Sequence, residues 1–159
     1  MIHLRDMLYG FLIVVLIPLL HYGVDNVIYS GLWDLKYDYL PLFITPAACI
    51  ILCGSARPAP FFLTGICLAF SLTLAMSMLN DMAWPRHGHR GLDYLLGSIG
   101  AAAGAIISLT YMKIKKKPPI SSYMLLGFTG TLLGFIMSQQ AFCNTVIYCG
   151  PFSFLHYTR

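Results

Sequence analysis

Charged side chains are scarce in this chain: among 159 residues there are ten lysines and arginines and six acidic residues, 10% in all. A typical soluble domain has about 25%. The few charges fall almost entirely in the gaps between long uncharged stretches, and the chain is 58% hydrophobic. A charged side chain at the centre of a bilayer costs about 2.5–3.5 kcal/mol, so charges confined to short gaps indicate a polytopic membrane protein.

Motifs for catalysis are also missing from the sequence. It contains no Cys-x-x-Cys pair, no phosphate-binding loop, no HExxH and no recognisable Ser/His/Asp triad. The net charge of +4 does not indicate nucleic-acid binding, because four of the positive charges form one cluster, Lys113, Lys115, Lys116 and Lys117. We therefore expect no enzyme, no cofactor and no nucleic-acid partner.

The uncharged stretches predict an all-α membrane protein, a single bundle of about five transmembrane helices with short loops in one domain, 1–159. About 20 apolar residues cross a bilayer core, and the expected spans are approximately 7–24, 39–56, 60–80, 94–112 and 120–140. The second is the weakest because Pro41 and Pro46 lie near its start, so it is either a kinked span or partly re-entrant. No small-x-small cleavage site follows the first, which favours a retained anchor over a signal peptide.

Orientation follows from the positive charges. With five spans, one side of the membrane holds Arg5, Arg57 and the lysine cluster, whereas the other holds Lys36, Arg86, Arg90 and Arg159. The side with more positive charge is normally cytoplasmic. We expect a bacterial inner (plasma) membrane protein with a cytoplasmic N-terminus and an outward C-terminus.

A glycine pattern recurs with a shift of 30 residues in the fourth and fifth spans. Each contains G-x-x-G-x-x-x-G followed by serine, at Ser108 and at Ser138. The repeated glycines are Gly97, Gly100, Gly104, Gly127, Gly130 and Gly134. Such ridges let helix backbones approach closely in lipid. They predict either packing of the two spans within one chain or an interface with a partner or a second copy.

The densest polar segment is the outward loop 80–93, which resembles a binding site in composition. Its candidate residues are Asp81, Trp84, Arg86, His87, His89, Arg90 and Asp93. Histidines and aspartates are metal ligands, but their spacing here matches no standard site. Arginines beside a tryptophan suit a phosphate or carboxylate group at the membrane surface, or the loop is an interfacial anchor. The other outward loop carries Asp25, Asp34 and Asp38 and is a candidate partner for the arginines.

The five cysteines fall into two groups. Cys49, Cys53 and Cys67 lie within predicted spans and are expected to be small apolar fillers, although Cys49 and Cys53 share a helical face. Cys143 and Cys149 flank the end of the fifth span on the expected oxidising side. They predict a local disulfide.

Residues 80–108 resemble the VanZ-like membrane proteins. That family has a polar span end, an arginine-containing loop and an aspartate leading into D-x-x-x-N-x-x-G-x-x-x-G, and Asp81, Arg86, Asp93, Gly100 and Gly104 match it. Gly97 stands where the family usually has asparagine. The resemblance implies an envelope protein, linked in some members to tolerance of glycopeptide antibiotics.

These patterns lead to two functional hypotheses. The first is a small non-catalytic protein that acts by helix packing and by presenting charged outward loops to a membrane protein partner or a second copy, as an immunity-type or accessory subunit. The alternative is a small transporter, or a VanZ-like protein that binds lipid or an envelope precursor. Membrane lipids are expected contacts in both.

Overall fold

The computed structural model describes residues 6, 8–10, 12, 40–83, 92–114 and 120–145. The described residues are helical apart from the short turn at 56–61, and no strand occurs among them, so the all-α prediction is confirmed for this part of the chain. The long helices are α3 (Leu40–Ser55), α4 (Phe62–Ala83), α5 (Leu92–Ile114) and α6 (Ile120–Thr145). Their bounds closely overlap the expected spans. Residues 6, 8–10 and 12 are helical as well; the rest of the first expected span lies outside the described residues.

Helix α3 tolerates both of its prolines. Pro41 lies in the first turn, where a backbone N–H would have no helical partner, so little is lost. Pro46 lies further inside and removes one helical hydrogen bond, yet the helix continues to Ser55 and the proline is buried. The segment forms a proline-containing helix of 16 residues, and the choice between a kinked span and a partly re-entrant segment stays a prediction.

A tight turn between Ala56 and Phe61 reverses the chain from α3 into α4. The Arg57 amide donates to the Gly54 carbonyl (3.1 Å), and the Phe62 amide donates to the Ala59 carbonyl (3.3 Å). Arg57 and Phe61 have φ angles of 50° and 66°, the left-handed region that side chains with a β-carbon rarely adopt. This strained turn holds α3 and α4 as an antiparallel hairpin.

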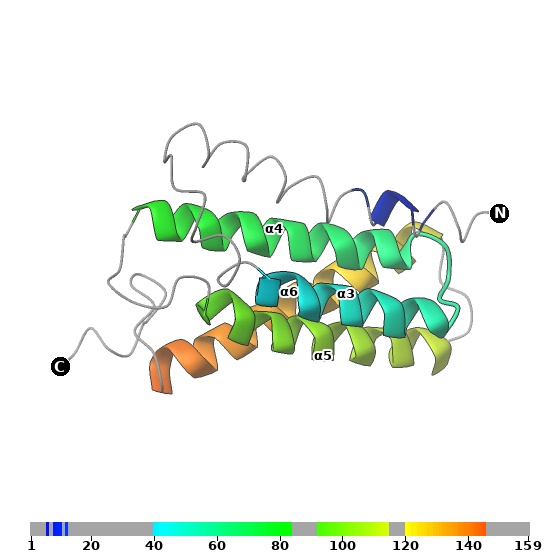
Figure 1. Ribbon diagram of the computed structural model, residues 1–159. Coiled ribbons are helices and arrows are strands. Elements are labelled where there is room, and N and C mark those ends of the chain that lie inside the picture. The colour runs from blue at the N-terminus through cyan, green and yellow to red at the C-terminus, as the bar shows by residue number, and fades with distance from the viewer. Residues whose placement is uncertain are drawn as a thin grey trace.

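The four helices lie side by side and alternate in direction (Figure 1). Helices α3 and α5 run one way, and α4 and α6 run the other. Helix α6 packs against both α4 and α5, whereas α3 packs against α5 and α4. The end of α4 and the start of α5 therefore meet at the same end of the bundle.

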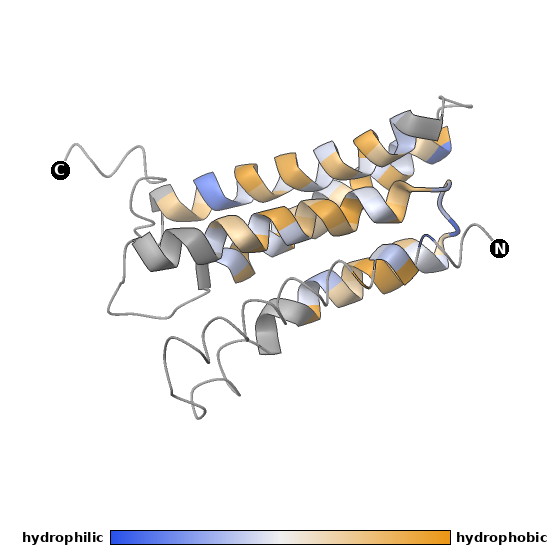
Figure 2. Cartoon of the chain, turned by 90° about the horizontal axis from the view of Figure 1, so that it is seen from above, coloured by the Kyte–Doolittle hydropathy of each residue, from blue (hydrophilic) through white to orange (hydrophobic). Residues whose placement is uncertain are grey.

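The outer surface of the bundle is apolar, as is most of its core. Large apolar side chains are exposed on each of the four helices, with Ile107 69% exposed and Met137 73% exposed. In Figure 2, hydrophobic residues recur along the helices, interspersed with less hydrophobic ones. The interior contains several small hydroxyl side chains: Ser71, Thr73, Ser77, Ser98, Ser108 and Thr131. One segment of the described residues, Tyr94–Ile114, is a helix both long and apolar enough to cross a membrane, and Ile44–Ser55 and Phe62–Ser77 are shorter apolar helices.

Candidate functional site: the glycine-lined helix interface

Helices α5 and α6 approach closely along the two glycine ridges. A β-carbon at Gly104 would overlap the carbonyl group of Gly130 and would lie 3.1 Å from the α-carbon of Gly134. A β-carbon at Gly134 would overlap the carbonyl oxygen of Gly100 in the same way. Because the obstructing atoms are backbone atoms, no side-chain rotation can relieve the overlap. Only glycine fits at these positions without moving the helices apart.

The contacts between the ridges have local two-fold symmetry. Gly100 faces Gly134 and Gly104 faces Gly130 across the antiparallel pair. The 30-residue repeat relates Gly100 to Gly130 and Gly104 to Gly134, so applying it to one contact produces the other. The two ridges are thus each other's partner within one chain. Of the two uses predicted for them, this part of the structure shows the intramolecular one.

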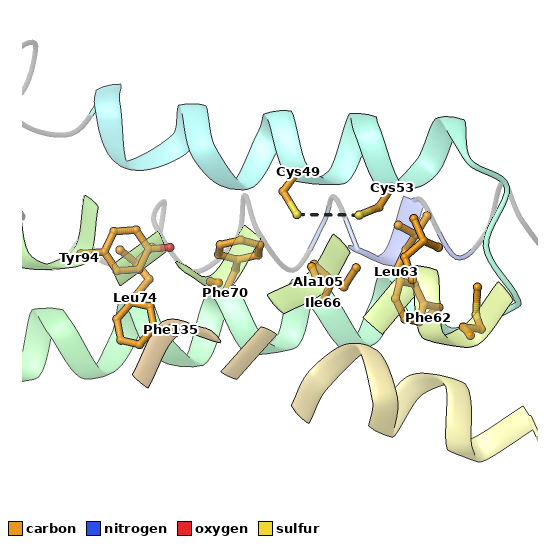
Figure 3. Packing of buried hydrophobic residues seen from close by; sticks show 13 residues of the cluster. Cys49, Cys53, Phe62, Leu63, Ile66, Phe70, Leu74, Tyr94, Ala105 and Phe135 are labelled. Carbon is orange, nitrogen blue, oxygen red and sulfur yellow. Dashed lines mark hydrogen bonds between the residues drawn. The ribbon is translucent and has the colours of Figure 1, made fainter. Parts of the chain in front are cut away.

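Serine and aromatic side chains extend the same interface. The Ser138 hydroxyl donates to the Leu96 carbonyl oxygen (2.9 Å), a hydrogen bond between α6 and α5. Gly97 makes room for the Phe135 ring, whose nearest carbon would lie 2.5 Å from a β-carbon at that position. The rings of Phe135 and Tyr94 are tilted by 46° with centroids 5.9 Å apart. Figure 3 shows this pair at one end of the buried cluster.

A second glycine contact joins α4 to α6. A β-carbon at Gly127 would lie 2.5 Å from the Phe62 carbonyl oxygen, and one at Gly65 would overlap the backbone of Met124. The sequence pattern identified Gly127 but not Gly65 as a packing residue, because Gly65 belongs to no G-x-x-x-G ridge. Helix α6 therefore uses different glycines for its two neighbours: Gly127 for α4, and Gly130 and Gly134 for α5.

Asp6 is a buried acidic residue that the sequence analysis did not single out. Its side chain is 2% exposed, and its Oδ1 accepts hydrogen bonds from the Thr64 amide (3.2 Å) and from the Thr64 hydroxyl. Thr64 lies in the first turn of α4, where backbone amides lack helical partners and negative charge is favourable. Asp6 thus caps α4 from a segment 58 residues away. Its Oδ2 has no hydrogen-bond partner in the part of the chain that the structure describes.

The cysteines differ in their bonding. Cys49, Cys53 and Cys67 are free, buried thiols. Cys143 is buried and disulfide-bonded. Cys149 lies outside the described residues, so the pairing of Cys143 with Cys149 stays a prediction, although no other cysteine of the chain is left for it.

The structure does not describe the charged loops that the sequence analysis proposed for binding. These residues lie outside it: Asp25, Asp34, Asp38, Trp84, Arg86, His87, His89 and Arg90. Asp81 lies in the last turn of α4 and Asp93 in the first turn of α5, but their side chains are not described. The two aspartates are consequently placed at one end of the bundle, and no contact between them is established.

Among the described residues, no group of three or more histidine, cysteine, aspartate or glutamate side chains is arranged to hold a metal ion. The arrangement that is described consists of glycine-lined helix contacts, a capped helix and a buried dithiol. No protein-family model matches the chain, and no curated protein or solved structure is significantly similar to it.

Proposed function

We propose that this chain is a small, non-catalytic protein of the bacterial inner membrane, in which a bundle of about five spans holds two charged outward loops for a membrane protein partner. An immunity-type or accessory subunit has these properties. The observation that supports the proposal is the apolar outer surface of the described helices.

The outer surface suits lipid better than water. On α6, Leu125 and Leu133 are 62% and 59% exposed, and on α3, Ile51 is 67% exposed. Water-soluble monomers rarely expose contiguous apolar patches larger than a few hundred Å². In a bilayer the same side chains contact acyl chains without a hydrophobic penalty.

The buried hydroxyl groups suit a bilayer as well. Thr131 donates to the Gly127 carbonyl (2.7 Å) and Ser98 donates to the Leu95 carbonyl (2.8 Å), each within its own helix. A hydroxyl satisfied in this way carries little polarity to the helix surface, so it permits close packing of helices in lipid. The helices therefore pack through small and hydroxyl residues as well as through the large apolar side chains of the core.

Helices α5 and α6 are long enough to cross a bilayer. At 1.5 Å per residue, the 23 residues of α5 extend about 34 Å and the 26 residues of α6 about 39 Å, compared with about 30 Å of hydrocarbon. The 16 described residues of α3 extend about 24 Å, which is short for a span. Helix α3 is consequently the element whose crossing most needs a direct test.

The packing of the ridges favours a structural role over transport. The glycines of α5 and α6 bring the two backbones into contact, which leaves no path for a solute between these helices. Because each ridge is covered by the other, a partner must bind the outer helix faces or the loops. We place the partner contact at the outward loops, with Arg86 and Arg90 as its main contributors.

Affinity purification in mild detergent, followed by mass spectrometry of proteins and lipids, tests this role. Arg86→Ala/Arg90→Ala should lose a co-purifying membrane protein while the amount of inserted protein stays near normal. Arg86→Lys/Arg90→Lys is the matched control because it keeps the charge that orients the chain. Co-purification of lipid without any protein partner would support the lipid-binding alternative, and unchanged capture by the alanine variant would contradict the proposed contact.

A further inference from the structure

Two buried thiols face each other on α3, and nothing in the proposed function uses them. Cys49 is 2% exposed and Cys53 is 0% exposed, and their sulfur atoms are 4.0 Å apart. Figure 3 shows both sulfurs below α3, on the side that faces Ile66 and Ala105. We propose that Cys49 and Cys53 form a two-thiolate site for one soft divalent metal ion of the d10 class, with Hg(II) as its simplest representative.

The separation of the sulfurs suits a shared metal ion. A metal–thiolate bond is about 2.3 Å long, which puts two sulfurs on one ion ~3.8 Å apart at a tetrahedral angle and ~4.6 Å apart when the bonds are collinear. The observed 4.0 Å lies within this interval. An ion with only two ligands favours the collinear arrangement, so the two side chains must rotate to lengthen the sulfur separation by about 0.6 Å.

A disulfide fits the same pair poorly. Its sulfurs must lie about 2.05 Å apart with β-carbons about 3.5–4.5 Å apart. Residues four apart on a helix have β-carbons about 5–6 Å apart. Oxidation would require α3 to distort, whereas metal binding does not, so the geometry favours a ligand pair over a redox pair.

The choice of ion follows from coordination number and charge. Zn(II) takes four ligands in structural sites, and the described residues provide no group of three or more suitable side chains. Ions that accept two sulfur ligands, such as Cu(I) and Hg(II), remain. Binding releases both thiol protons, so the divalent ion leaves a neutral complex and the monovalent ion leaves one buried negative charge. An apolar interior disfavours that charge strongly, which selects the divalent ion.

Cys67 provides a matched internal control. It is a free, fully buried thiol on α4, and among the described residues the thiol–thiol contact joins Cys49 to Cys53 and leaves Cys67 out. A metal ion bound by one thiolate lacks a second ligand from the same chain. That second ligand raises the affinity by about 10²–10⁴. Substitution of Cys67 should leave the paired site intact.

The experiment titrates Hg(II) into the full-length protein in detergent, without reductant so that the Cys143 disulfide persists, in competition with a small monothiol. We expect one tightly held ion per chain and X-ray absorption with two sulfur neighbours. Cys49→Ala and Cys53→Ala should each weaken binding at least about a hundredfold, whereas Cys67→Ala should change it less than about threefold. Cu(I) should bind more weakly than Hg(II) in the same competition.

The result that overturns the site is equal affinity in Cys49→Ala and the unmodified chain, or an equal loss in Cys67→Ala. Monodisperse elution and unchanged helical circular dichroism of each variant separate loss of ligands from loss of fold. If Cys49→Ala fails to fold, Cys49→Ser, which keeps a polar side chain of similar volume, provides the same comparison. Tighter binding of Cu(I) than of Hg(II) would contradict the charge argument.

Discussion

Replacing Gly104 by leucine should separate α5 from α6, because the new β-carbon would overlap the Gly130 carbonyl group. Forcing extra atoms into a close-packed contact costs about 1–3 kcal/mol. Moving the helices apart also weakens the dispersion contacts along both ridges, which adds about 1 kcal/mol. We therefore expect Gly104→Leu to lower the free energy of unfolding by about 2–4 kcal/mol.

Ala103→Leu is the matched control, since Ala103 is the preceding residue and is exposed on the outside of α5. It adds a similar side chain where the proposal places lipid, so its effect should stay within about 0.5 kcal/mol. Thermal unfolding in detergent measures both, with an expected decrease in melting temperature of roughly 5–15 °C for Gly104→Leu. Equal stability of the two variants would refute the assignment of Gly104 to a backbone contact.

Three further predictions concern other contacts. Ser138→Ala removes the hydrogen bond to the Leu96 carbonyl and should lower the free energy of unfolding by about 1 kcal/mol. Ser122→Ala, outside this contact, should be nearly neutral. Urea or SDS titration measures both, and equal stability of the two variants would contradict the prediction. Asp6→Ala removes the cap of α4 and should make Cys67, which lies beneath Gly10, react faster with a membrane-permeant maleimide, and an unchanged rate would contradict the capping role. Unreduced, alkylated protein should carry no label on Cys143 or Cys149, and full alkylation of both would contradict their pairing.

The helices were predictable because their limits coincide with the charges and prolines that end each uncharged stretch. The ridges of α5 and α6 were predictable because the same pattern occurs twice, and two copies of a self-complementary ridge can cover each other. The sequence did not decide between intramolecular and intermolecular use of the ridges. That choice depends on the register of α5 against α6, which becomes visible only when Gly100 and Gly134 are seen in contact.

The remaining features depend on contacts between distant residues. Asp6 caps α4 at Thr64, 58 residues away in the sequence, and no local sequence motif indicates such a contact. Gly65 packs on Met124 without a second glycine in register. The inward faces were also not predictable from periodicity, because helices that are apolar on most of their circumference carry little amphipathic signal. Small and hydroxyl residues lie on the inward side together with large apolar ones such as Phe62, Phe70 and Tyr94.

The most direct test of the account is the membrane topology, measured with alkaline phosphatase fused after Lys117 and, separately, after Arg159. The proposed bundle predicts that the fusion after Lys117 is inactive and the fusion after Arg159 is active, with both proteins in the membrane fraction. Inactivity of both fusions together with recovery of the protein in the soluble fraction would contradict a membrane-spanning bundle. Activity after Lys117 with inactivity after Arg159 would contradict the proposed orientation or the crossing of α3.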